Sequence, residues 1–542
     1  MSAGPLIVQS DRTVLLETDH PSAADARHEL AIFAELERAP EHIHTYRITR
    51  LGLWNARAAG HDADFILDSL TRWSKFELPG SVVSEIRSTI DRFGKLVISR
   101  DDEGLILVSD SAAVMAEVSS NKKIGELLTE RIDAGFRIQP WARGQLKQQL
   151  LKLGWPAEDT AGFTPGTPYE ISLDNSQWEL RDYQKQAVEK FQAGGSGVVV
   201  LPCGAGKTLV GAATMAELKR NTLILVTNTV AARQWRDELL ARTSLTEDDI
   251  AEYSGSSKEL APVTIATYQI LTTKRKGEFA HLALLDARDW GLIIYDEVHL
   301  LPAPIFKMTA DLQARRRLGL TATLVREDGR ESDVFSLIGP KRFDAPWKDI
   351  EAQGYIAPAE CFEVRVELPD DERMEYAIAD GDNRFRIAAT AKAKIPLMKR
   401  ILARHEGDPT LIIGQYLDQI DEVAELLGIP KLTGQTPVDE REQLFRDFRT
   451  GKLKALVVSK VANFSVDLPE ASVAIQISGA FGSRQEEAQR LGRLLRPKQD
   501  GRTAQFYTLI ARDTLEQDFA QNRQRFLAEQ GYSYEILDSD SI

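Results

Sequence analysis

The sequence predicts an α/β fold in which two parallel-sheet lobes follow an α+β amino-terminal region. From residue 198 onward, short apolar runs rich in β-branched residues alternate with stretches long enough for crossover helices, as in an open parallel sheet. The same alternation begins again at residue 411, after a region, 343–404, that four prolines interrupt. The chain has 542 residues, more than one core supports, and about 150 residues per domain gives roughly three or four domains.

Each predicted strand of the two lobes is a short apolar run between helical stretches. In the first lobe these runs are Val198–Leu201, Leu223–Val226, Val263–Tyr268, Leu292–Tyr295 and Leu318–Leu320. In the second lobe they are Leu411–Ile413, Ala455–Val458, Val473–Ile477 and Gln505–Ile510, with helices over Asp418–Leu427 and Arg441–Arg449. The predicted domains are an amino-terminal region 1–165, a first lobe 166–345, an inter-lobe region 346–405 and a second lobe 406–542.

The amino-terminal region has a different pattern. Strands are predicted over Leu6–Gln9 and Thr13–Glu17, and helices over Ala23–Glu37, Leu51–Ala59, Asp64–Trp73 and Val82–Phe93. A hairpin, Lys95–Ser99 and Leu105–Ser109, follows the last helix, and 122–131 and 143–153 add a further α/β element. Helices followed by a hairpin are the order of a winged helix, which often holds DNA. A purely structural role explains this order equally well.

Composition bounds the function without fixing it. The formal net charge of −14 counts against a simple basic nucleic-acid binder, although binding depends on local phosphate contacts. No apolar run approaches the ~18 residues of a membrane span, and no signal-peptide pattern opens the chain. The two cysteines, Cys203 and Cys361, are too few for a disulfide framework. We therefore expect a cytoplasmic protein that does not contact a membrane.

A glycine-rich turn after the first predicted strand indicates a phosphate site. Leu201-Pro202-Cys203-Gly204-Ala205-Gly206-Lys207-Thr208 joins this strand to an apolar helix, so the backbone N–H groups of the turn and the helix amino terminus point to one place. Lys207 supplies a positive charge for the β and γ phosphates, and Thr208 a hydroxyl for Mg²⁺. Taken alone, the turn also fits a purely structural role.

An acidic pair completes the predicted site. Asp296 and Glu297 follow the apolar run Leu292–Tyr295, and the carboxyl ends of parallel strands are where such sheets bind ligands. Asp296 is placed to hold Mg²⁺, and Glu297 to orient or deprotonate the attacking water. An Asp-Glu pair is more often a helix-terminal charge, but here the strand, the spacing and the partner turn agree. The sequence therefore predicts hydrolysis of a nucleotide with ATP and Mg²⁺ as cofactors.

A basic stretch in the second lobe is the candidate partner of this site. Arg490, Arg493 and Arg496 recur every three residues and share much of one helix face. A solvated surface would look the same. With a phosphate site in the first lobe, the alternative is that these arginines cross the cleft and stabilise charge on the γ-phosphate.

At this point the sequence resembles the XPB helicase family of superfamily 2, closely over Trp178–Pro497 and more loosely before that. Leu180–Gln184 is similar to the Q motif, Leu201–Thr208 to motif I and Asp296–His299 to motif II in its Asp-Glu-Val-His form. The segments similar to motifs III, V and VI are Leu320–Thr323, Val458–Pro469 and Gln485–Arg496. The triplet Arg326-Glu327-Asp328 is the most diagnostic match.

The resemblance implies two RecA-like motor lobes that move 3′ to 5′ on DNA and open duplexes in DNA repair. It implies that Arg181 and Gln184 bind adenine, that residues 202–208 bind phosphates, and that Asp467 holds the ribose. Gln489, Arg493 and Arg496 would act at the γ-phosphate together with Asp296 and Glu297. Residues implied to couple hydrolysis to DNA movement or strand separation are His299, Thr321, Thr323, Arg326, Glu327 and Asp328.

The family also has a thumb-like insert between its lobes. Basic residues at about that place are Arg384, Arg386, Lys392, Lys394, Lys399 and Arg400. DNA contact and a solvated surface explain this run equally well.

Two further functions stay open. In the first, the chain is an ATP-gated DNA clamp or scaffold that recruits a nuclease and unwinds little. In the second, it is an RNA helicase. The expected partners are DNA, at single-stranded and duplex junctions, and a nuclease, with the chain itself acting as a monomer.

Overall fold

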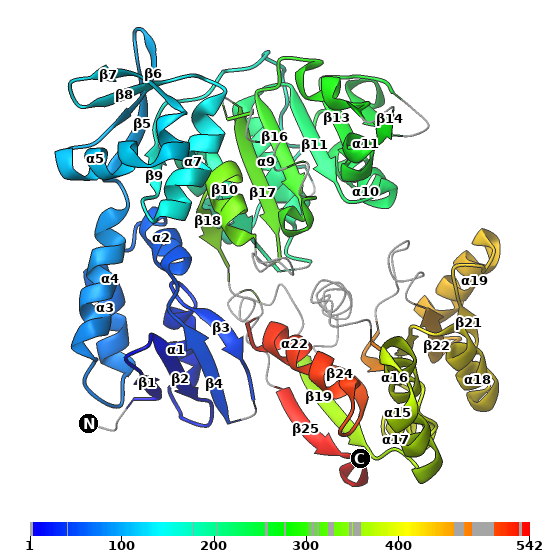
Figure 1. Ribbon diagram of the computed structural model, residues 1–542. Coiled ribbons are helices and arrows are strands. Elements are labelled where there is room, and N and C mark those ends of the chain that lie inside the picture. The colour runs from blue at the N-terminus through cyan, green and yellow to red at the C-terminus, as the bar shows by residue number, and fades with distance from the viewer. Residues whose placement is uncertain are drawn as a thin grey trace.

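The computed structural model describes residues 4–40, 42–176, 178–202, 204–254, 258–275, 278–302, 305, 309, 312–313, 315–322, 330–345, 350, 359–459, 471–479, 503–529 and 534–542. Figure 1 shows the amino-terminal elements along one side of the molecule, with the first lobe beside their upper part and the second lobe beside their lower part. None of the helices in these ranges combines the length and apolar character that a bilayer crossing requires.

The first part of the amino-terminal region is an antiparallel sheet with helices. Its strand order is β1 (Leu6–Val8), β2 (Thr13–Glu17), β4 (Ile43–Arg47) and β3 (Glu35–Arg38), and its helices are α1 (Ala23–Leu30), α2 (Arg50–Ala58), α3 (Ala63–Trp73) and α4 (Gly80–Arg92). The predicted helix over Ala23–Glu37 is wrong beyond Leu30. Of the residues in β3 only Leu36 is buried, and pairing with β4 supplies the backbone hydrogen bonds that a longer helix would have made.

The second part is a five-stranded sheet in the order β7 (Leu128–Ile132), β8 (Gly135–Ile138), β6 (Gly104–Val108), β5 (Leu96–Asp101) and β9 (Ala157–Asp159). Its helices are α5 (Ala112–Ser120), α6 (Lys122–Gly125) and α7 (Ala142–Leu153). The predicted order of helices and a hairpin is present as α2, α3, α4 and β5–β6. The hairpin is not an isolated wing, because β8 and β9 extend it on both sides.

Lobe 1 is a seven-stranded parallel sheet. The order is β12 (Ile250–Tyr253), β13 (Val263–Thr267), β11 (Thr222–Val226), β16 (Leu292–Asp296), β17 (Arg316–Thr321), β10 (Ser196–Val200) and β18 (Lys341–Asp344). The connecting helices include α8 (Asp182–Gly194), α9 (Lys207–Leu218), α10 (Thr229–Arg242) and α11 (Tyr268–Thr272). All five predicted strands are confirmed. The unpredicted strands, β12 and β18, lie at the two edges.

Lobe 2 is a second seven-stranded parallel sheet, which confirms the predicted fold class. The order is β21 (Lys431–Leu432), β22 (Ala455–Ser459), β20 (Thr410–Gly414), β23 (Val473–Gln476), β24 (Ala504–Ala511), β19 (Ala359–Val366) and β25 (Tyr534–Asp538). Its helices include α15 (Asp370–Ile378), α16 (Gly381–Ala389), α17 (Lys394–Arg404), α18 (Leu417–Leu427), α19 (Val438–Arg449) and α22 (Leu515–Glu529). The predicted inter-lobe region 346–405 therefore contributes a strand to lobe 2, because β19 pairs with β24 and β25.

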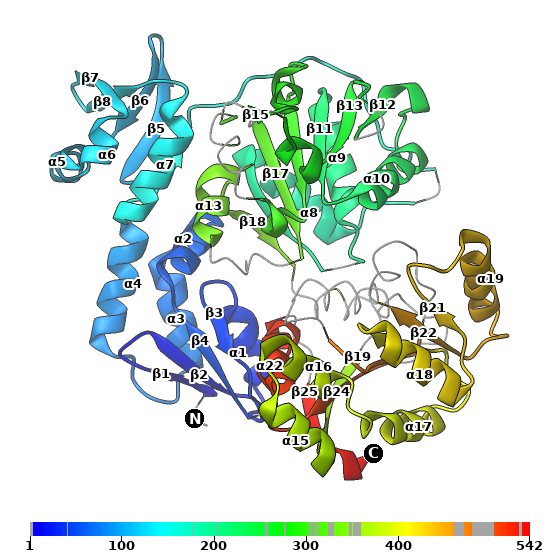
Figure 2. The ribbon, with the colours of Figure 1, turned by 45° about the vertical axis from the view of Figure 1, so that its right-hand side comes forward.

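The amino-terminal region docks on lobe 1 through an apolar cluster and two hydrogen bonds. Trp54 and Leu151 pack against Phe335 of lobe 1. The Asn55 Oδ1 accepts from the Lys341 backbone N–H at 2.9 Å, and the Gln148 Nε2 donates to the Asp333 Oδ1 at 2.8 Å. Figure 2 shows α2 and α7 beside α13 (Glu331–Asp333) and β18 of lobe 1.

A buried charge cluster lies next to this junction. The Asp159 carboxylate accepts hydrogen bonds from Arg143 Nη2 at 2.7 Å and from Lys147 Nζ at 2.9 Å. The side chains of Arg143 and Lys147 are 1% and 9% exposed. The ring of Phe163, in the segment that leads to lobe 1, lies 5.8 Å from the guanidinium of Arg143 and 5.8 Å from that of Arg317 in β17. Two buried cations, Arg143 and Lys147, thus share one carboxylate at the edge of lobe 1.

Asp159→Asn is expected to destabilise the amino-terminal region by about 3–5 kcal/mol, because it leaves Arg143 and Lys147 buried without a counter-charge. Thermal unfolding and limited proteolysis of the full chain would measure the change. Asp110→Asn is the matched control, since the Asp110 carboxylate, 72% exposed, pairs with Lys95 at the surface. Equal effects of the two substitutions would contradict the assignment.

Candidate active site

The phosphate loop lies between β10 and α9. Gly204 and Gly206 have φ angles of 81° and 79°, in the left-handed region that favours glycine, and Gly206 is the N-cap of α9. A Cβ on Gly206 would lie 2.5 Å from Gln184 Nε2. The glycines thus allow a tight turn that presents the first N–H groups of α9 to one point, which is an anion-binding arrangement.

Helix α8 holds this loop in place through hydrogen bonds. The Tyr183 hydroxyl and Gln184 Nε2 both donate to the Ala205 carbonyl, at 2.8 and 2.9 Å. The Arg181 Nη1 donates to the Tyr183 hydroxyl at 3.0 Å, and the Arg181 backbone N–H donates to Gln184 Oε1 at 2.9 Å. Gln184 therefore supports the phosphate loop in this structure. The adenine contacts that the resemblance implies for Arg181 and Gln184 stay predictions, and Gln184 would have to exchange its present partners to make them.

The acidic pair lies against the loop. Asp296 is the last residue of β16, and the Glu297 Oε1 lies 3.0 Å from Lys207 Nζ. Glu297 has a φ of 49°, a left-handed conformation that few non-glycine residues adopt and that is found repeatedly at active sites. The side chains of Lys207 and Glu297 are 12% and 14% exposed. The structure therefore brings the predicted cation and the predicted base together, although 90 residues separate them in the sequence.

Burial and mutual repulsion set the charges of this pair. Burial, followed by repulsion from Glu297, raises the pKa of Asp296 to about 6. Burial also acts to raise the pKa of Glu297, but attraction to Lys207 and then to His299 outweighs it and lowers the net pKa. Glu297 is therefore the first of the two carboxyls to lose its proton as the pH rises. Asp296 at the end of β16 and Thr208 in the first turn of α9 both carry oxygen donors, the ligands that Mg²⁺ prefers.

A second contact joins the acidic pair to β17. The His299 Nδ1 lies 2.7 Å from the Thr321 Oγ1 and 3.5 Å from the Glu297 Oε2. Both His299 and Thr321 are buried. His299, one of the residues that the resemblance assigns to coupling, thus contacts both Thr321, a second such residue, and the proposed base Glu297.

The indole of Trp235, on α10, holds the other carboxylate. Its Nε1 donates to the Asp296 Oδ2 at 3.0 Å, and its ring lies so close to α9 that a Cβ on Gly211 would be 2.5 Å from it. The Tyr268 hydroxyl donates to the Asp296 backbone carbonyl at 2.7 Å. The sequence predicted neither residue, because an aromatic side chain in a helix carries no local sign of a polar contact.

Trp235→Phe is expected to raise the Mg²⁺ concentration that half-saturates ATP hydrolysis by roughly tenfold or more. The substitution keeps the packing but removes a hydrogen bond to a charged group, worth about 1.5–3 kcal/mol. ATPase rates across a Mg²⁺ titration would measure it. Trp290→Phe is the control, because the buried Trp290 Nε1 donates to the Leu284 carbonyl instead. An unchanged Mg²⁺ dependence in Trp235→Phe would refute this role.

Several predicted residues lie outside the described residues, so their positions stay predictions. They are Cys203, Thr323, Arg326, Glu327, Asp328, Asp467, Gln489, Arg493 and Arg496. Of the other predicted positions, Pro202 is buried, and Thr208 follows Lys207 in the first turn of α9.

Only some of the basic residues between the lobes are exposed at the surface. The prediction that Lys394 could contact DNA is wrong, because its side chain is fully buried. The Lys394 Nζ donates to both Glu516 carboxylate oxygens at 2.8 Å and to the Ala389 and Ile477 carbonyls. Arg386 forms an ion pair with Asp418 of α18. Lys392, Lys399 and Arg400 are exposed, and Arg384 lies over the ring of Tyr376.

Comparison with known proteins connects these features to a family. The model described as ERCC3/RAD25/XPB C-terminal helicase matches residues 350–541. The models described as helicase conserved C-terminal domain and as type III restriction enzyme, res subunit, match residues 6–133 and 177–326.

Curated relatives match the whole chain. The DNA 3′-5′ helicase XPB of Kineococcus radiotolerans is 64% identical over 100% of this chain and 98% of its own length. That of Mycobacterium tuberculosis is 62% identical over 100% and 99%. The helicase/translocase subunit XPB of the general transcription and DNA repair factor IIH of Saccharomyces cerevisiae is 30% identical over 98% of this chain and 72% of its own length.

Proposed function

Because the chain belongs to the XPB family of superfamily 2 helicases and is an ATP-dependent 3′-5′ DNA helicase, we propose that it opens DNA during repair of the nucleotide excision type. The observation that carries the catalytic part is the Lys207–Glu297 contact at 3.0 Å beside Asp296. The repair role is supported by the yeast relative, whose name includes a DNA repair factor.

In the proposed reaction, the phosphate loop and Lys207 hold the β and γ phosphates of ATP. Asp296 and the Thr208 hydroxyl are the residues that would hold Mg²⁺, which neutralises phosphate charge when bound. Trp235 keeps the Asp296 carboxylate in place. Lys207 exchanges Glu297 for phosphate oxygens, and Glu297 then accepts a proton from the attacking water.

The same contacts suggest how hydrolysis changes the grip on DNA. Glu297 contacts His299, and His299 contacts Thr321 at the end of β17. When Lys207 exchanges Glu297 for phosphate oxygens, the charge beside His299 changes. Because His299 contacts Thr321, the segment that follows Thr321 responds to the state of the nucleotide site. We propose that residues 323–328 use this signal at the point where the strands separate.

Closure of the two lobes is the remaining element of the proposal. Arg493 and Arg496, with Gln489, would reach the γ-phosphate from lobe 2 and complete the site. One chain carries both halves of this pocket, which supports action as a monomer. A partner nuclease and a cytoplasmic location stay predictions from the sequence.

Strand displacement on a 3′-tailed duplex tests the proposal. The wild-type chain should separate the strands with ATP and Mg²⁺, and Glu297→Gln should not. A 5′-tailed duplex is the matched substrate control and should stay annealed. ATP-dependent binding of DNA without displacement would instead support the clamp, and stronger ATPase stimulation by RNA than by DNA would support an RNA helicase.

A further inference from the structure

A cavity of about 560 Å³ lies between the amino-terminal region and lobe 1. One wall comes from the end of α2, the segment after α4, α7 and β9. The other wall comes from residues 192–196, Arg316 of β17 and residues 335–342. Its volume is within the range of small-molecule sites, roughly 300–1,000 Å³.

The cavity is separate from the nucleotide site. It contains Ser196, the first residue of β10, whereas the phosphate loop follows Val200 at the other end of the same strand. Five residues of strand span about 16 Å. A ligand in this cavity would therefore approach lobe 1 from the amino ends of its strands, the edge opposite to the phosphate loop.

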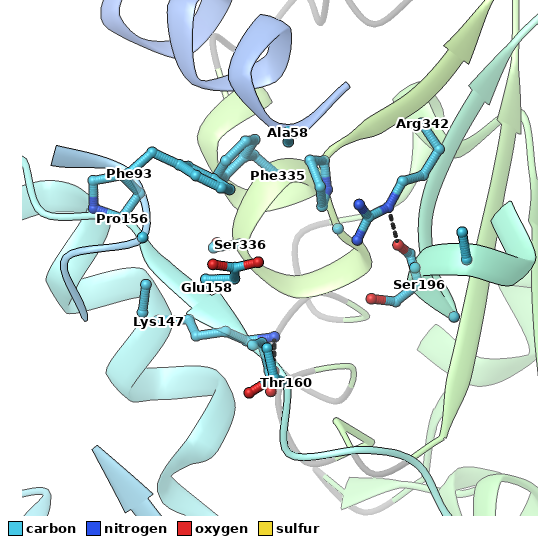
Figure 3. Close-up of a pocket in the computed structure, with 18 of the residues that line it drawn as sticks. Ala58, Phe93, Lys147, Pro156, Glu158, Thr160, Ser196, Phe335, Ser336 and Arg342 are labelled. Carbon is cyan, nitrogen blue, oxygen red and sulfur yellow. Dashed lines mark hydrogen bonds and ion pairs between the residues drawn. The ribbon is translucent and has the colours of Figure 1, made fainter. Parts of the chain in front are cut away.

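One side of the cavity is apolar. Figure 3 shows the rings of Phe93 and Phe335 close together on one side, near Pro156, with Arg342 on the opposite side and the Glu158 carboxylate below the rings. Such a lining suits a ligand with a flat, apolar part and a charged part.

The opposite side is cationic. Arg57, Arg316 and Arg342 line the cavity. Within the described part of the chain none of them forms an ion pair within 4 Å, but the Glu158 carboxylate, which also lines the cavity, attracts Arg342. The Arg342 Nε donates a hydrogen bond to the Ser196 carbonyl at 2.9 Å. Burial lowers the pKa of Arg342 although attraction to Glu158 acts against it, and burial with repulsion from Arg220 lowers the pKa of Arg316. Three guanidinium groups face the one carboxylate of Glu158, and such an excess of positive charge, partly desolvated at Arg316 and Arg342, favours an anion.

The floor of the cavity adds to this excess of positive charge. Lys147 lines the cavity, and with Arg143 it shares the carboxylate of Asp159. Burial lowers the pKa of Lys147 to about 8 despite the attraction of Asp159, and Arg317 and Arg143 act in the same direction as burial. Asp159 is thus paired with Arg143 and Lys147, and among the other residues that line the cavity Glu158 is the one carboxylate that opposes the charge of the arginines.

We propose that this cavity is a second ligand site, which binds a phosphate-bearing molecule of mononucleotide size and ties the amino-terminal region to lobe 1. The phosphate lies against Arg342 and Arg316, with Arg57 at the rim. The base packs on the side of Phe93 and Phe335. Glu158 accepts hydrogen bonds from sugar hydroxyls or a base amino group. Both walls contact the ligand, so its binding stabilises the docked arrangement of the two parts.

Calorimetric titration of the full chain carrying Lys207→Ala tests this site, because that substitution removes tight binding at the phosphate loop. The probes are AMP, inorganic phosphate and a short DNA duplex. We expect AMP to bind, to bind more tightly than phosphate, and to raise the unfolding temperature. Arg342→Gln and Arg57→Gln should each weaken AMP binding by roughly tenfold, the value of one charge-assisted hydrogen bond.

Arg131→Gln is the matched control, since Arg131 is exposed on β7 and does not line the cavity. Arg57 is also exposed, so Arg57→Gln tests the site even where Arg342→Gln fails to fold. The proposal is overturned if AMP does not bind, if it binds equally to all variants, or if phosphate binds as tightly as AMP. Duplex binding that depends on these arginines, without AMP binding, would also overturn it in favour of a nucleic-acid surface.

Discussion

Glu297→Gln is expected to slow ATP hydrolysis by roughly 10²- to 10⁴-fold, the contribution of a positioned general base. The amide has nearly the shape of the carboxylate but cannot accept the proton of the attacking water. Glu297 is suited to this role because attraction to Lys207 and His299 keeps its pKa low despite burial, so it is charged near neutral pH. Single-turnover hydrolysis with excess enzyme would measure the chemical step directly.

The same variant should bind ATP at least as well as the wild type. Without nucleotide, Lys207 Nζ is 3.0 Å from the Glu297 carboxylate, and this ion pair competes with the phosphates for the ammonium group. Removing the negative charge removes the competitor. Lys207→Ala should do the opposite and abolish tight binding. Equilibrium titration with a fluorescent ATP analogue distinguishes the two variants.

Glu170→Gln provides a matched control within lobe 1. Glu170 pairs with Lys219 at 2.8 Å and is 86% exposed. The same chemical change therefore removes an ion pair at the surface instead of a buried one at the phosphate loop. Its hydrolysis rate should stay at the wild-type value. A normal rate in Glu297→Gln itself would show that another group takes the proton.

The interior strands of both lobes could be predicted because parallel strands covered on both faces are continuous apolar runs. Every residue of β11 and β13 is buried, and their sequences, Thr-Leu-Ile-Leu-Val and Val-Thr-Ile-Ala-Thr, have no charge. The edge strands β12 and β18 carry charged residues and lacked this signal. An edge strand pairs with a neighbouring strand on one side only, and its sequence is therefore closer to that of a loop.

Strand β19 shows a different limit. Its sequence, Ala-Glu-Cys-Phe-Glu-Val-Arg-Val, places Glu363 in the middle of a buried strand. The Glu363 carboxylate is satisfied by Arg365, by Gln524 of α22 and by the Tyr534 hydroxyl of β25. Gln524 and Tyr534 lie more than 150 residues further along the chain. No local pattern reveals such partners, so the strand was assigned to the region between the lobes.

The candidate site could be predicted where chemistry requires a fixed residue type. The phosphate loop, Lys207 and the acidic pair have this property, and the structure brings Lys207 and Glu297 into contact. Chemistry does not fix the residue type at Trp235 and Tyr183, and aromatic residues in helices pack in the core of most proteins. Their polar groups became visible only through the hydrogen bonds to Asp296 and to the Ala205 carbonyl.

Arg493→Ala is expected to reduce ATP turnover by roughly 10³-fold or more while leaving ATP binding nearly unchanged, the pattern of a lost arginine finger. Lobe 1 offers Lys207 as a point charge, and in this structure that charge is held by Glu297. Negative charge on the transferring phosphoryl group spreads over three oxygens in the transition state, so further cations must approach from another direction. The helix face that the spacing of Arg490, Arg493 and Arg496 predicts is the candidate source in lobe 2.

Steady-state kinetics with saturating DNA separate this role from a structural one. A finger acts after binding, so kcat should fall while the affinity for a fluorescent ATP analogue stays the same. Arg446→Ala is the matched control in lobe 2, because the Arg446 guanidinium is 60% exposed on α19 and pairs with Glu442 at 3.9 Å. Wild-type turnover in Arg493→Ala would mean that lobe 1 completes hydrolysis alone. Movement of lobe 2 would then follow the chemistry rather than enable it, and the coupling through His299 and Thr321 would have to carry the whole conformational signal.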